Sequence, residues 1–480
     1  MAISERKRRG AWYTPPELVA TLVDAAIDAA FLERCNASGV AGRAIRVLDP
    51  ACGDGRFLHA ARTRIEAFGG AAHLTGFDID PDAITEARER LGDADLVVAD
   101  ALGSHGVVGG DTELAYDVVI GNPPFLSQMA AATTRGSASR HGGGPYADAA
   151  VEFVALAADV VRPDGGRVAF VLPQSILSAR DAQPIRRQVD ERAAMIWSSW
   201  TGEREFDAQV LTCALVFEFS SNASPSSGDG RTGSWARVVT ERLGVPPVPT
   251  VLEGAPVSTL GDRAWLNANF RDEYYGMVSA VGDHGVGPAL ITSGLIDPGV
   301  NHWGRRPVRF AKQKFAAPRI DVDRLDPKMR AWAAKRLVPK VMVANQTPIL
   351  EAVCDPDGVC LPGVPVVSIY PTGPDAAAVA WEIAAVLTSA SASVWAWHQR
   401  GGTGLSADTI RVGPVMLAAL PWPTGPLDAA VAVLRAGDVV GCSELVDAAY
   451  GVDVDEAAAM QRWWRPILER VADRADRADR

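Results

Sequence analysis

The stretch that decides the fold is VLDPACGDGRFL, residues 47–58. Its apolar start is typical of a buried strand, its middle of a glycine turn and its end of a helix. Gly53 and Gly55 let the backbone approach a ligand closely, and the start of the helix offers unpaired N–H groups. A dinucleotide fingerprint would place a third glycine three residues after Gly55, where Leu58 stands instead.

Acidic residues follow the next two expected strands. A second strand ends in Leu74–Pro81, and its Asp78 lies 23 residues after Gly55, where a doubly wound fold places a ribose-binding carboxylate. A third short strand, Leu96–Asp100, also ends in an acid. Open α/β sheets bind ligands at the carboxyl ends of their strands. The pattern therefore predicts an α/β sheet with a ligand site at that edge.

A fourth strand, Tyr116–Ile120, runs through Gly121 into Asn122-Pro123-Pro124-Phe125. Two consecutive prolines stiffen the loop and remove two backbone donors. The Asn122 side-chain oxygen and the Pro123 carbonyl, held side by side, suit the two hydrogens of a planar NH2 group, and Phe125 offers a flat face to a ring. The alternative is a proline-rich turn after a buried strand, with asparagine as turn former.

Together these motifs resemble S-adenosylmethionine-dependent methyltransferases that modify exocyclic amino groups. The N-terminal segment Trp12–Leu18 contains Tyr13-Thr14-Pro15, which resembles the family's segment under the methionine end of the cofactor. The order of the three motifs resembles the gamma-class (TaqI-like) DNA adenine-N6 methyltransferases of restriction-modification systems. The resemblance implies a Rossmann-like methyltransferase sheet, with S-adenosylmethionine as cofactor, followed by a C-terminal α+β target-recognition domain.

The resemblance also implies roles for individual residues. The target adenine would be flipped out of the duplex and would stack on Phe125 and Phe206, although Phe206 also suits a strand core. At position 125 the commoner tyrosine of the family is replaced by Phe. Neither a metal nor a covalent intermediate is required. The implied catalytic residues are Asn122, Pro123, Pro124 and Phe125, and the implied cofactor-binding residues are Thr14, Asp49, Ala51, Gly53, Gly55, Asp78, Ile79, Asp100, Ala101 and Asn122.

The composition is that of a globular chain. Its 480 residues suggest two to three domains, with 48% hydrophobic and 22% charged residues. No apolar run approaches the roughly 18 residues of a membrane span, and the start of the chain lacks a signal-peptide apolar region. The six cysteines show no metal-binding spacing, which favours reduced thiols. We expect a cytoplasmic protein without membrane contact.

The net charge of −11 argues at first against nucleic acid. Residues 301–345, however, hold twelve Lys or Arg and three acids, a local charge of +9 that leaves −20 elsewhere. Such a strip predicts contact with double-stranded DNA, the alternative being a solvated charged face. The DNA-binding candidates are Arg305, Arg306, Arg309, Lys312 and Lys314.

The domain boundary is expected at the proline-rich segment 246–249, after a Ser/Gly-rich tract at 220–234. This predicts a catalytic domain at 1–245 and a target-recognition domain with C-terminal helices at 246–480. Within the second part, Ala380–Trp397 is expected to be helical. A separately encoded restriction nuclease is a candidate partner.

Other functions remain open from the sequence. A protein glutamine methyltransferase uses a similar loop, because an amide NH2 also presents two hydrogens, but it does not need the long basic C-terminal part. An RNA adenine methyltransferase is another alternative, as is a non-catalytic cofactor-binding or DNA-binding subunit. The recognition sequence and the oligomeric state cannot be read from the sequence.

Overall fold

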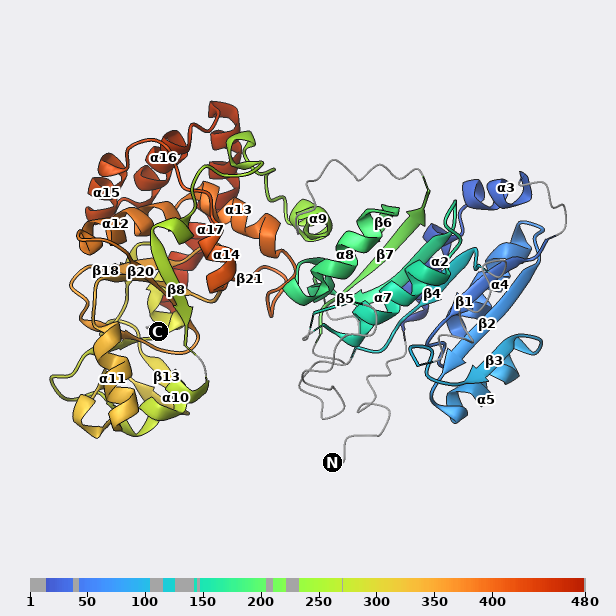
Figure 1. Ribbon diagram of the computed structural model, residues 1–480, viewed down its shortest axis with the longest axis horizontal. Coiled ribbons are helices and arrows are strands. Elements are labelled where there is room, and N and C mark those ends of the chain that lie inside the picture. The colour runs from blue at the N-terminus through green and yellow to red at the C-terminus, as the bar shows by residue number, and fades with distance from the viewer. Residues whose placement is uncertain are drawn as a thin grey trace. The chain divides into compact units, whose positions relative to one another are not determined.

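The chain folds into two compact units in the computed structural model, Met1–Val238 and Val239–Arg480. The structure describes residues 14–37, 43–103, 115–125, 142–144, 147–203, 210–221, 233–269 and 271–478. Figure 1 labels the helices and strands of both units. The division falls within helix α9 (Gly233–Arg242), a few residues before the proline-rich segment.

Unit 1 is built on a seven-stranded sheet with the order β3-β2-β1-β4-β5-β7-β6. Strand β7 is antiparallel to both its neighbours, and the other pairings are parallel. This confirms the α/β sheet expected from the sequence. The strands are β1 (Ile45–Asp49), β2 (Ala72–Asp78), β3 (Asp95–Val98), β4 (Val118–Gly121), β5 (Arg167–Pro173), β6 (Ala193–Ser199) and β7 (Thr212–Phe219).

Helices cover both faces of this sheet (Figure 1). The apolar side chains of α2, α3, α4 and α5 form one core with strand residues such as Val47 and Ile120. On the other face α7 packs against β5, α8 packs against β6, and the Trp235 ring of α9 lies 4.7 Å from that of Phe217. The helices are α2 (Pro16–Ala26), α3 (Ala29–Ala37), α4 (Arg56–Ala67), α5 (Pro81–Leu91), α7 (Ala149–Val160) and α8 (Gln183–Asp190).

Local sequence explains where these helices begin and end. Helix α5 starts after Asp80, whose side chain accepts a hydrogen bond from the Asp82 N–H, and Pro81 occupies the first turn. Helix α7 starts in the same way after Asp148, whose side chain accepts from the Ala150 N–H. Helix α5 ends at Leu91 and is followed by Gly92, the C-cap residue, which has a φ of 67°.

Unit 2 contains an antiparallel sheet with the order β18-β16-β20-β8, against which α12 packs. A smaller sheet, β19-β10-β15-β9, and a hairpin of β13 (Val308–Phe310) and β14 (Gln313–Phe315) lie in the same unit. The larger sheet comprises β8 (Ala264–Ala268), β16 (Lys340–Ala344), β18 (Ala352–Asp355) and β20 (Val366–Pro371), and the smaller one β9 (Val281–Gly282), β10 (Ala289–Ile291), β15 (Arg319–Ile320) and β19 (Cys360–Pro362).

The helical structure predicted at 380–397 is confirmed, except that it is interrupted at Thr388 and Ser389. The structure has α12 (Ala376–Leu387) and α13 (Ala390–Arg400), bent by 68° at the break between them. The Ser389 hydroxyl caps α13 by accepting from the Ala392 N–H, and the Thr388 hydroxyl bonds back to the Ala384 carbonyl. Two hydroxyl residues in a row therefore end one helix and begin the next.

The last two helices of unit 2 are α16 (Val439–Tyr450) and α17 (Val454–Ala478). The buried Asp447 of α16 accepts hydrogen bonds from Ser391 of α13 and Gln461 of α17. Among the described residues, no single helix combines the length and apolar character needed to cross a membrane; α12 and α13 reach them only as a bent pair.

Candidate active site

The glycine turn between β1 and α4 follows from its sequence. Gly53 and Gly55 have φ values of 53° and 79°, a region that residues with a Cβ rarely adopt. A Cβ on Gly55 would also lie 2.9 Å from Leu91 Cδ1. The turn is closed by a 2.8 Å hydrogen bond from the Gly55 N–H to the Cys52 carbonyl. Because neither glycine has a side chain, the backbone N–H groups before α4 can be approached closely by a ligand.

Asp78 ties this turn to the carboxyl end of β2. Its Oδ2 accepts from the Gly53 N–H at 2.8 Å and its Oδ1 from the Asp80 N–H at 2.9 Å. Burial raises the pKa of Asp78, while these two hydrogen bonds oppose the rise. The predicted ribose carboxylate is therefore held in a fixed orientation beside the glycine turn.

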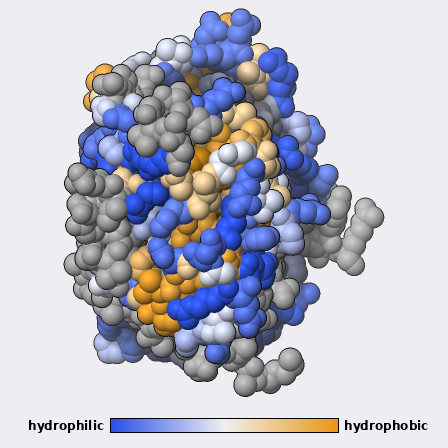
Figure 2. All heavy atoms as spheres, turned by 90° about the vertical axis from the view of Figure 1, so that its right-hand side faces the viewer, coloured by the Kyte–Doolittle hydropathy of each residue, from blue (hydrophilic) through white to orange (hydrophobic). Residues whose placement is uncertain are grey.

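Two exposed apolar residues flank the ends of β2 and β3. Ile79 is 55% exposed and Val98 46% exposed. Figure 2 views the end of unit 1 that carries β3 and α5, and it shows a band of apolar surface there. Asp100 is exposed, and its Oδ1 accepts from the Leu102 N–H, whereas Ala101 is buried.

Asp49 is the buried carboxylate of the site. It is 1% exposed, and its Oδ1 accepts from the Ala51 N–H at 3.0 Å. Its buried Oδ2 accepts no hydrogen bond from the described residues. Burial raises the pKa of Asp49 well above its ordinary value; the Ala51 hydrogen bond opposes this rise, and the neighbouring Asp78 carboxylate adds to it. A cationic ligand group that donates to Oδ2 would satisfy this carboxylate.

Gly121, at the end of β4, is required by the approach of Asp49. A Cβ built at Gly121 would lie 2.5 Å from Asp49 Oδ1, far closer than two such atoms can come. The glycine before the Asn-Pro-Pro loop therefore makes room for the buried carboxylate, which brings the ends of β1 and β4 together.

The Asn-Pro-Pro loop lies against the N-terminal segment. Asn122 Nδ2 donates to Thr14 Oγ1 at 3.0 Å, and Thr14 is 2% exposed. Pro123 is buried, whereas Phe125 is half-buried and packs against the core cluster of unit 1. Phe206, the second predicted stacking residue, lies outside the described residues.

Arg56 is a site residue that the sequence analysis did not identify. Its Nη1 donates to the Thr14 carbonyl at 2.7 Å, and its Nε and Nη2 bind the two oxygens of Asp54 at 3.0 and 2.8 Å. Arg90 reaches the same carboxylate at 3.1 Å. Burial would raise the pKa of Asp54, but hydrogen bonds and charges from Arg56 and Arg90 lower it below its ordinary value. The sequence feature that could have indicated this role is the position of Arg56 two residues after Asp54 in the glycine turn.

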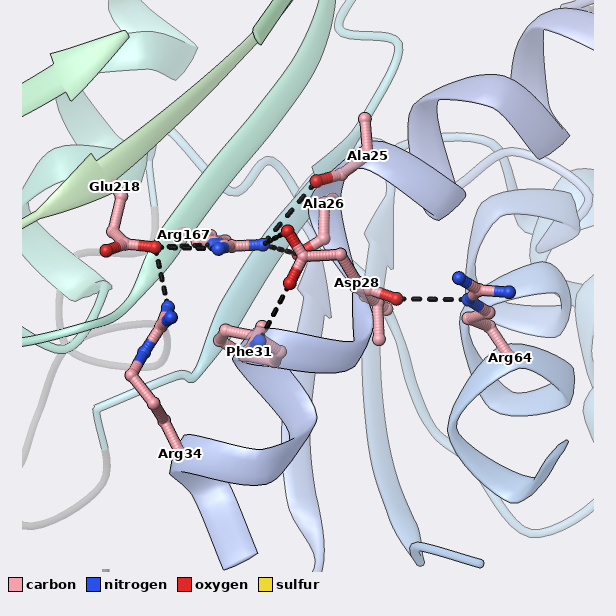
Figure 3. Close-up of polar contacts among 9 residues, drawn as sticks. Ala25, Ala26, Asp28, Phe31, Arg34, Arg64, Arg167 and Glu218 are labelled. Atoms are coloured by element: carbon pink, nitrogen blue, oxygen red, sulfur yellow. Dashed lines mark hydrogen bonds and ion pairs between the residues drawn. The ribbon is translucent and has the colours of Figure 1, made fainter. Parts of the chain in front are cut away.

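A second unforeseen group anchors α2, whose N-terminal end carries Thr14. Figure 3 shows Arg167 of β5 pointing at the carbonyls that end α2 and at Asp28 and Glu218. Its guanidinium lies 3.1 Å from Asp28 Oδ2 and 2.7 Å from Glu218 Oε2, and its side chain is 4% exposed. Arg34 binds Glu218 as well. The helix pair α2 and α3 is thus fastened to the sheet through one buried cation.

The basic strip of unit 2 divides into two kinds of residue. Arg305, Arg309, Lys312 and Lys314 are exposed. Arg306 instead forms a two-bond ion pair with Asp297, at 2.7 and 3.2 Å, and donates to the Gly294 carbonyl. Lys340 is fully buried against Asp355. These two ion pairs stabilise unit 2, and neither cation presents its charge to solvent as the exposed residues do.

No cluster of three or more His, Cys, Asp or Glu residues with metal-binding geometry occurs among the described residues. Cys354 and Cys360 are free thiols, as are the other four cysteines. Burial raises the pKa of both to about 12, so neither is a reactive thiolate near neutral pH.

Residues 1–195 match a protein-family model described as N-6 DNA Methylase. The type II methyltransferase M.BanIII of Aneurinibacillus aneurinilyticus is 33% identical over 138 residues, a match that covers 25% of this chain and 23% of the relative. The chain thus matches less than a quarter of that protein's length.

Two similar solved structures are methyltransferase subunits of type I restriction enzymes. The EcoKI M protein is 21% identical with a TM-score of 0.34, covering 44% of this chain and 45% of that one. The subunit from Streptococcus thermophilus is 18% identical with a TM-score of 0.34, covering 43% and 45%. Residues 1–195 thus match the N-6 DNA Methylase model, and S-adenosylmethionine is the cofactor.

Proposed function

We propose that the protein is a site-specific DNA methyltransferase that methylates the exocyclic amino group of a flipped-out adenine, and that it is of the gamma (TaqI-like) class. The observation that carries the proposal is the hydrogen bond between Asn122 and Thr14. This bond joins the Asn-Pro-Pro loop, which suits an NH2 group, to Thr14, which is proposed to lie at the methionine end of the cofactor. Asp49 packs against Gly121, the residue before the loop.

The residues of the site fit S-adenosylmethionine. Asp49 presents a buried oxygen that lacks a donor among the described residues, as the amino group of the methionine end requires. Asp78 is oriented for the ribose, and the exposed face of Ile79 suits a flat ring. Asp100 and Ala101 follow at the end of β3, with Asp100 proposed to accept from the adenine amino group. Thr14, Ala51, Gly53 and Gly55 complete the proposed contacts.

When bound, the cofactor supplies a methyl group on a sulfonium. The chain's own part is to prepare the nucleophile. The adenine amino nitrogen is weakly nucleophilic because its lone pair is delocalised into the ring. Hydrogen bonds from that NH2 to the Asn122 side-chain oxygen and the Pro123 carbonyl would localise the pair and meet the developing positive charge with fixed acceptors. The bond to Thr14 sets the rotation of the Asn122 amide before the substrate arrives.

An adenine inside a duplex cannot reach this loop, so it must be extruded and stacked. We propose Phe125 and Phe206 as the stacking residues. Unit 2 is proposed as the target-recognition domain, and Arg305, Arg309, Lys312 and Lys314 as its phosphate contacts; Arg306 is left out because Asp297 already binds it. A separately encoded restriction nuclease is the proposed partner in the cell.

The test is mass spectrometry of nucleosides after incubation of the full chain with S-adenosylmethionine and unmethylated bacterial DNA. N6-methyladenine in the DNA supports the proposal. Parallel reactions with RNA and with protein extract separate the alternatives. Methylation confined to RNA adenine or to glutamine side chains would overturn it.

A further inference from the structure

The hairpin of β13 (Val308–Phe310) and β14 (Gln313–Phe315) turns through an unusual pair of residues. Ala311 and Lys312 have φ values of 49° and 67°, and among the described residues they alone combine a positive φ with a side chain. Two-residue hairpin turns of this kind normally use Asn-Gly or Gly-Gly, because a Cβ in the left-handed region clashes with the backbone. The turn is therefore strained at two successive positions.

The surrounding structure holds this turn in place. The Ala311 N–H donates to Tyr274 Oη at 3.1 Å, and the Tyr274 ring lies 4.8 Å from that of Phe310. Val308, Phe310 and Phe315 are buried in the core of unit 2. The inward side of the hairpin thus fixes a conformation that its own turn residues disfavour, as is common where strain serves a function.

The outward side of the hairpin is cationic. Arg309 and Lys314 are register partners on the two strands, so their side chains leave the same face directly opposite each other. Lys312 stands at the tip, and all three residues are exposed. Like charges in this position destabilise a sheet. None of the three forms an ion pair with another described residue, in contrast to Arg306 and Lys340.

We propose that this hairpin, residues 308–315, is the element of unit 2 that docks into a groove of duplex DNA, with Arg309, Lys312 and Lys314 on the phosphates. The phosphates then neutralise the opposed charges of Arg309 and Lys314, and the Tyr274 contact holds the turn that carries Lys312. A two-stranded ribbon fits the major groove of B-DNA, whose two walls are lined with phosphates. The inference rests on the proposed function and deepens it. The hairpin lies outside residues 1–195, which match the family model.

The experiment measures the affinity of the full chain for a mixed-sequence DNA duplex by fluorescence anisotropy over a range of salt concentrations. Each lost phosphate contact should reduce the slope of log affinity against log salt by about 0.9. We therefore expect the slope to fall by about two in the double variant Arg309→Gln/Lys314→Gln and by about one in Lys312→Gly.

Two matched controls accompany these variants. Ala311→Gly relieves strain at the neighbouring turn position without removing a charge, so affinity and slope should stay at the wild-type values. Lys328→Gln with Lys335→Gln removes two exposed cations of α11 (Pro327–Arg336) in the same basic strip, and its slope should also be unchanged. Thermal melting confirms that each variant is folded.

A wild-type slope in both hairpin variants would overturn the inference, as would an equal loss in the α11 control. A larger loss for single-stranded RNA than for duplex would overturn it as well. Methyl transfer to DNA by the wild type is measured separately. If methyl transfer is absent while the hairpin variants change the slope, the proposed function fails and the hairpin remains the docking element. If methyl transfer occurs while the hairpin variants keep the wild-type slope, the proposed function stands and the hairpin is not the docking element.

Discussion

Asn122 and Thr14 lie 108 positions apart in the sequence and are joined by a 3.0 Å hydrogen bond from the amide nitrogen to the threonine hydroxyl. The bond connects the loop after β4 to the segment that leads into α2. Since it fixes one rotation of the amide, it defines which side of the loop presents the Asn122 oxygen.

Replacing Asn122 with Ala should reduce methyl transfer by about 10²–10³-fold, as loss of one preorganised polar group does in other enzymes. Affinity for S-adenosylmethionine, measured by calorimetry, should change little. Thr14→Ser keeps the hydroxyl and serves as the control, with near wild-type activity. A large loss of affinity for the cofactor in Asn122→Ala would show that Asn122 acts on the cofactor instead.

Arg56→Lys should weaken cofactor binding and lower the rate, although the charge is kept. A lysine cannot hold both Asp54 oxygens and also reach the Thr14 carbonyl, because it lacks the planar fork of the guanidinium. We expect a loss of about 1.5–3 kcal/mol, the range for hydrogen bonds to charged groups, visible in the KM for the cofactor.

The matched control for Arg56 is Arg62→Lys on the same helix. Arg62 also bridges a carbonyl, that of Leu91, and a carboxylate, that of Asp93, but lies away from Thr14. It should alter stability without altering the KM for the cofactor. Equal kinetic effects in the two variants would assign Arg56 to general stability.

Gly121→Ala should force Asp49 out of its position, because the new Cβ would lie 2.5 Å from Asp49 Oδ1. The expected cost is about 1–3 kcal/mol of stability, typical of an overpacked site, together with a raised dissociation constant for the cofactor. Gly294→Ala, where no atom lies within 4 Å of the added Cβ, is the control. Unchanged cofactor binding in Gly121→Ala would mean that Asp49 does not contact the ligand.

Asp49 also predicts a pH dependence. Its pKa is raised in the folded state, so the native protein binds this proton more tightly than the unfolded chain does. Stability should therefore fall as pH rises from about 4, the unfolded pKa, through the raised folded pKa. Asp49→Asn should gain stability relative to the wild type over that interval, measured by denaturant unfolding at each pH, while binding the cofactor more weakly. Parallel stability profiles would contradict the assignment.

Ala311→Gly should stabilise the protein by up to about 1 kcal/mol, because glycine adopts the left-handed region without the usual penalty. Lys312→Gly should give a similar gain while reducing DNA affinity. Chemical denaturation of the full chain measures the first effect. A loss of stability in both variants would show that the turn is not strained.

The strand-turn-helix motif and the ends of β2, β3 and β4 could be predicted because glycine, proline and acidic residues mark them locally. The break between α12 and α13 was missed because the apolar pattern continues across it, and only the Thr388 and Ser389 hydroxyls interrupt the backbone ladder. Arg56 and Arg167 were missed for another reason. Their partners lie up to 142 residues away, and single-sequence spacing carries no signal for such pairs.

The same limit applies to the basic strip. Charge counting treats Arg305 and Arg306 alike, yet burial beside Asp297 turns Arg306 into a structural residue. The role of Phe206, which lies outside the described residues, stays a prediction.

Arg167 has a consequence for synthesis of the chain. The end of α2 is held by Arg167 of β5, which is in turn paired with Glu218 of β7. Both residues are translated long after α2. Arg56 and Asn122 can contact Thr14 before then, but the far end of α2 lacks its anchor until Arg167 and Glu218 have emerged. A nascent chain stalled before β7 would hold the glycine turn and the Asn-Pro-Pro loop, yet its N-terminal helix would lack its full anchor, which ties acquisition of a competent site to completion of unit 1.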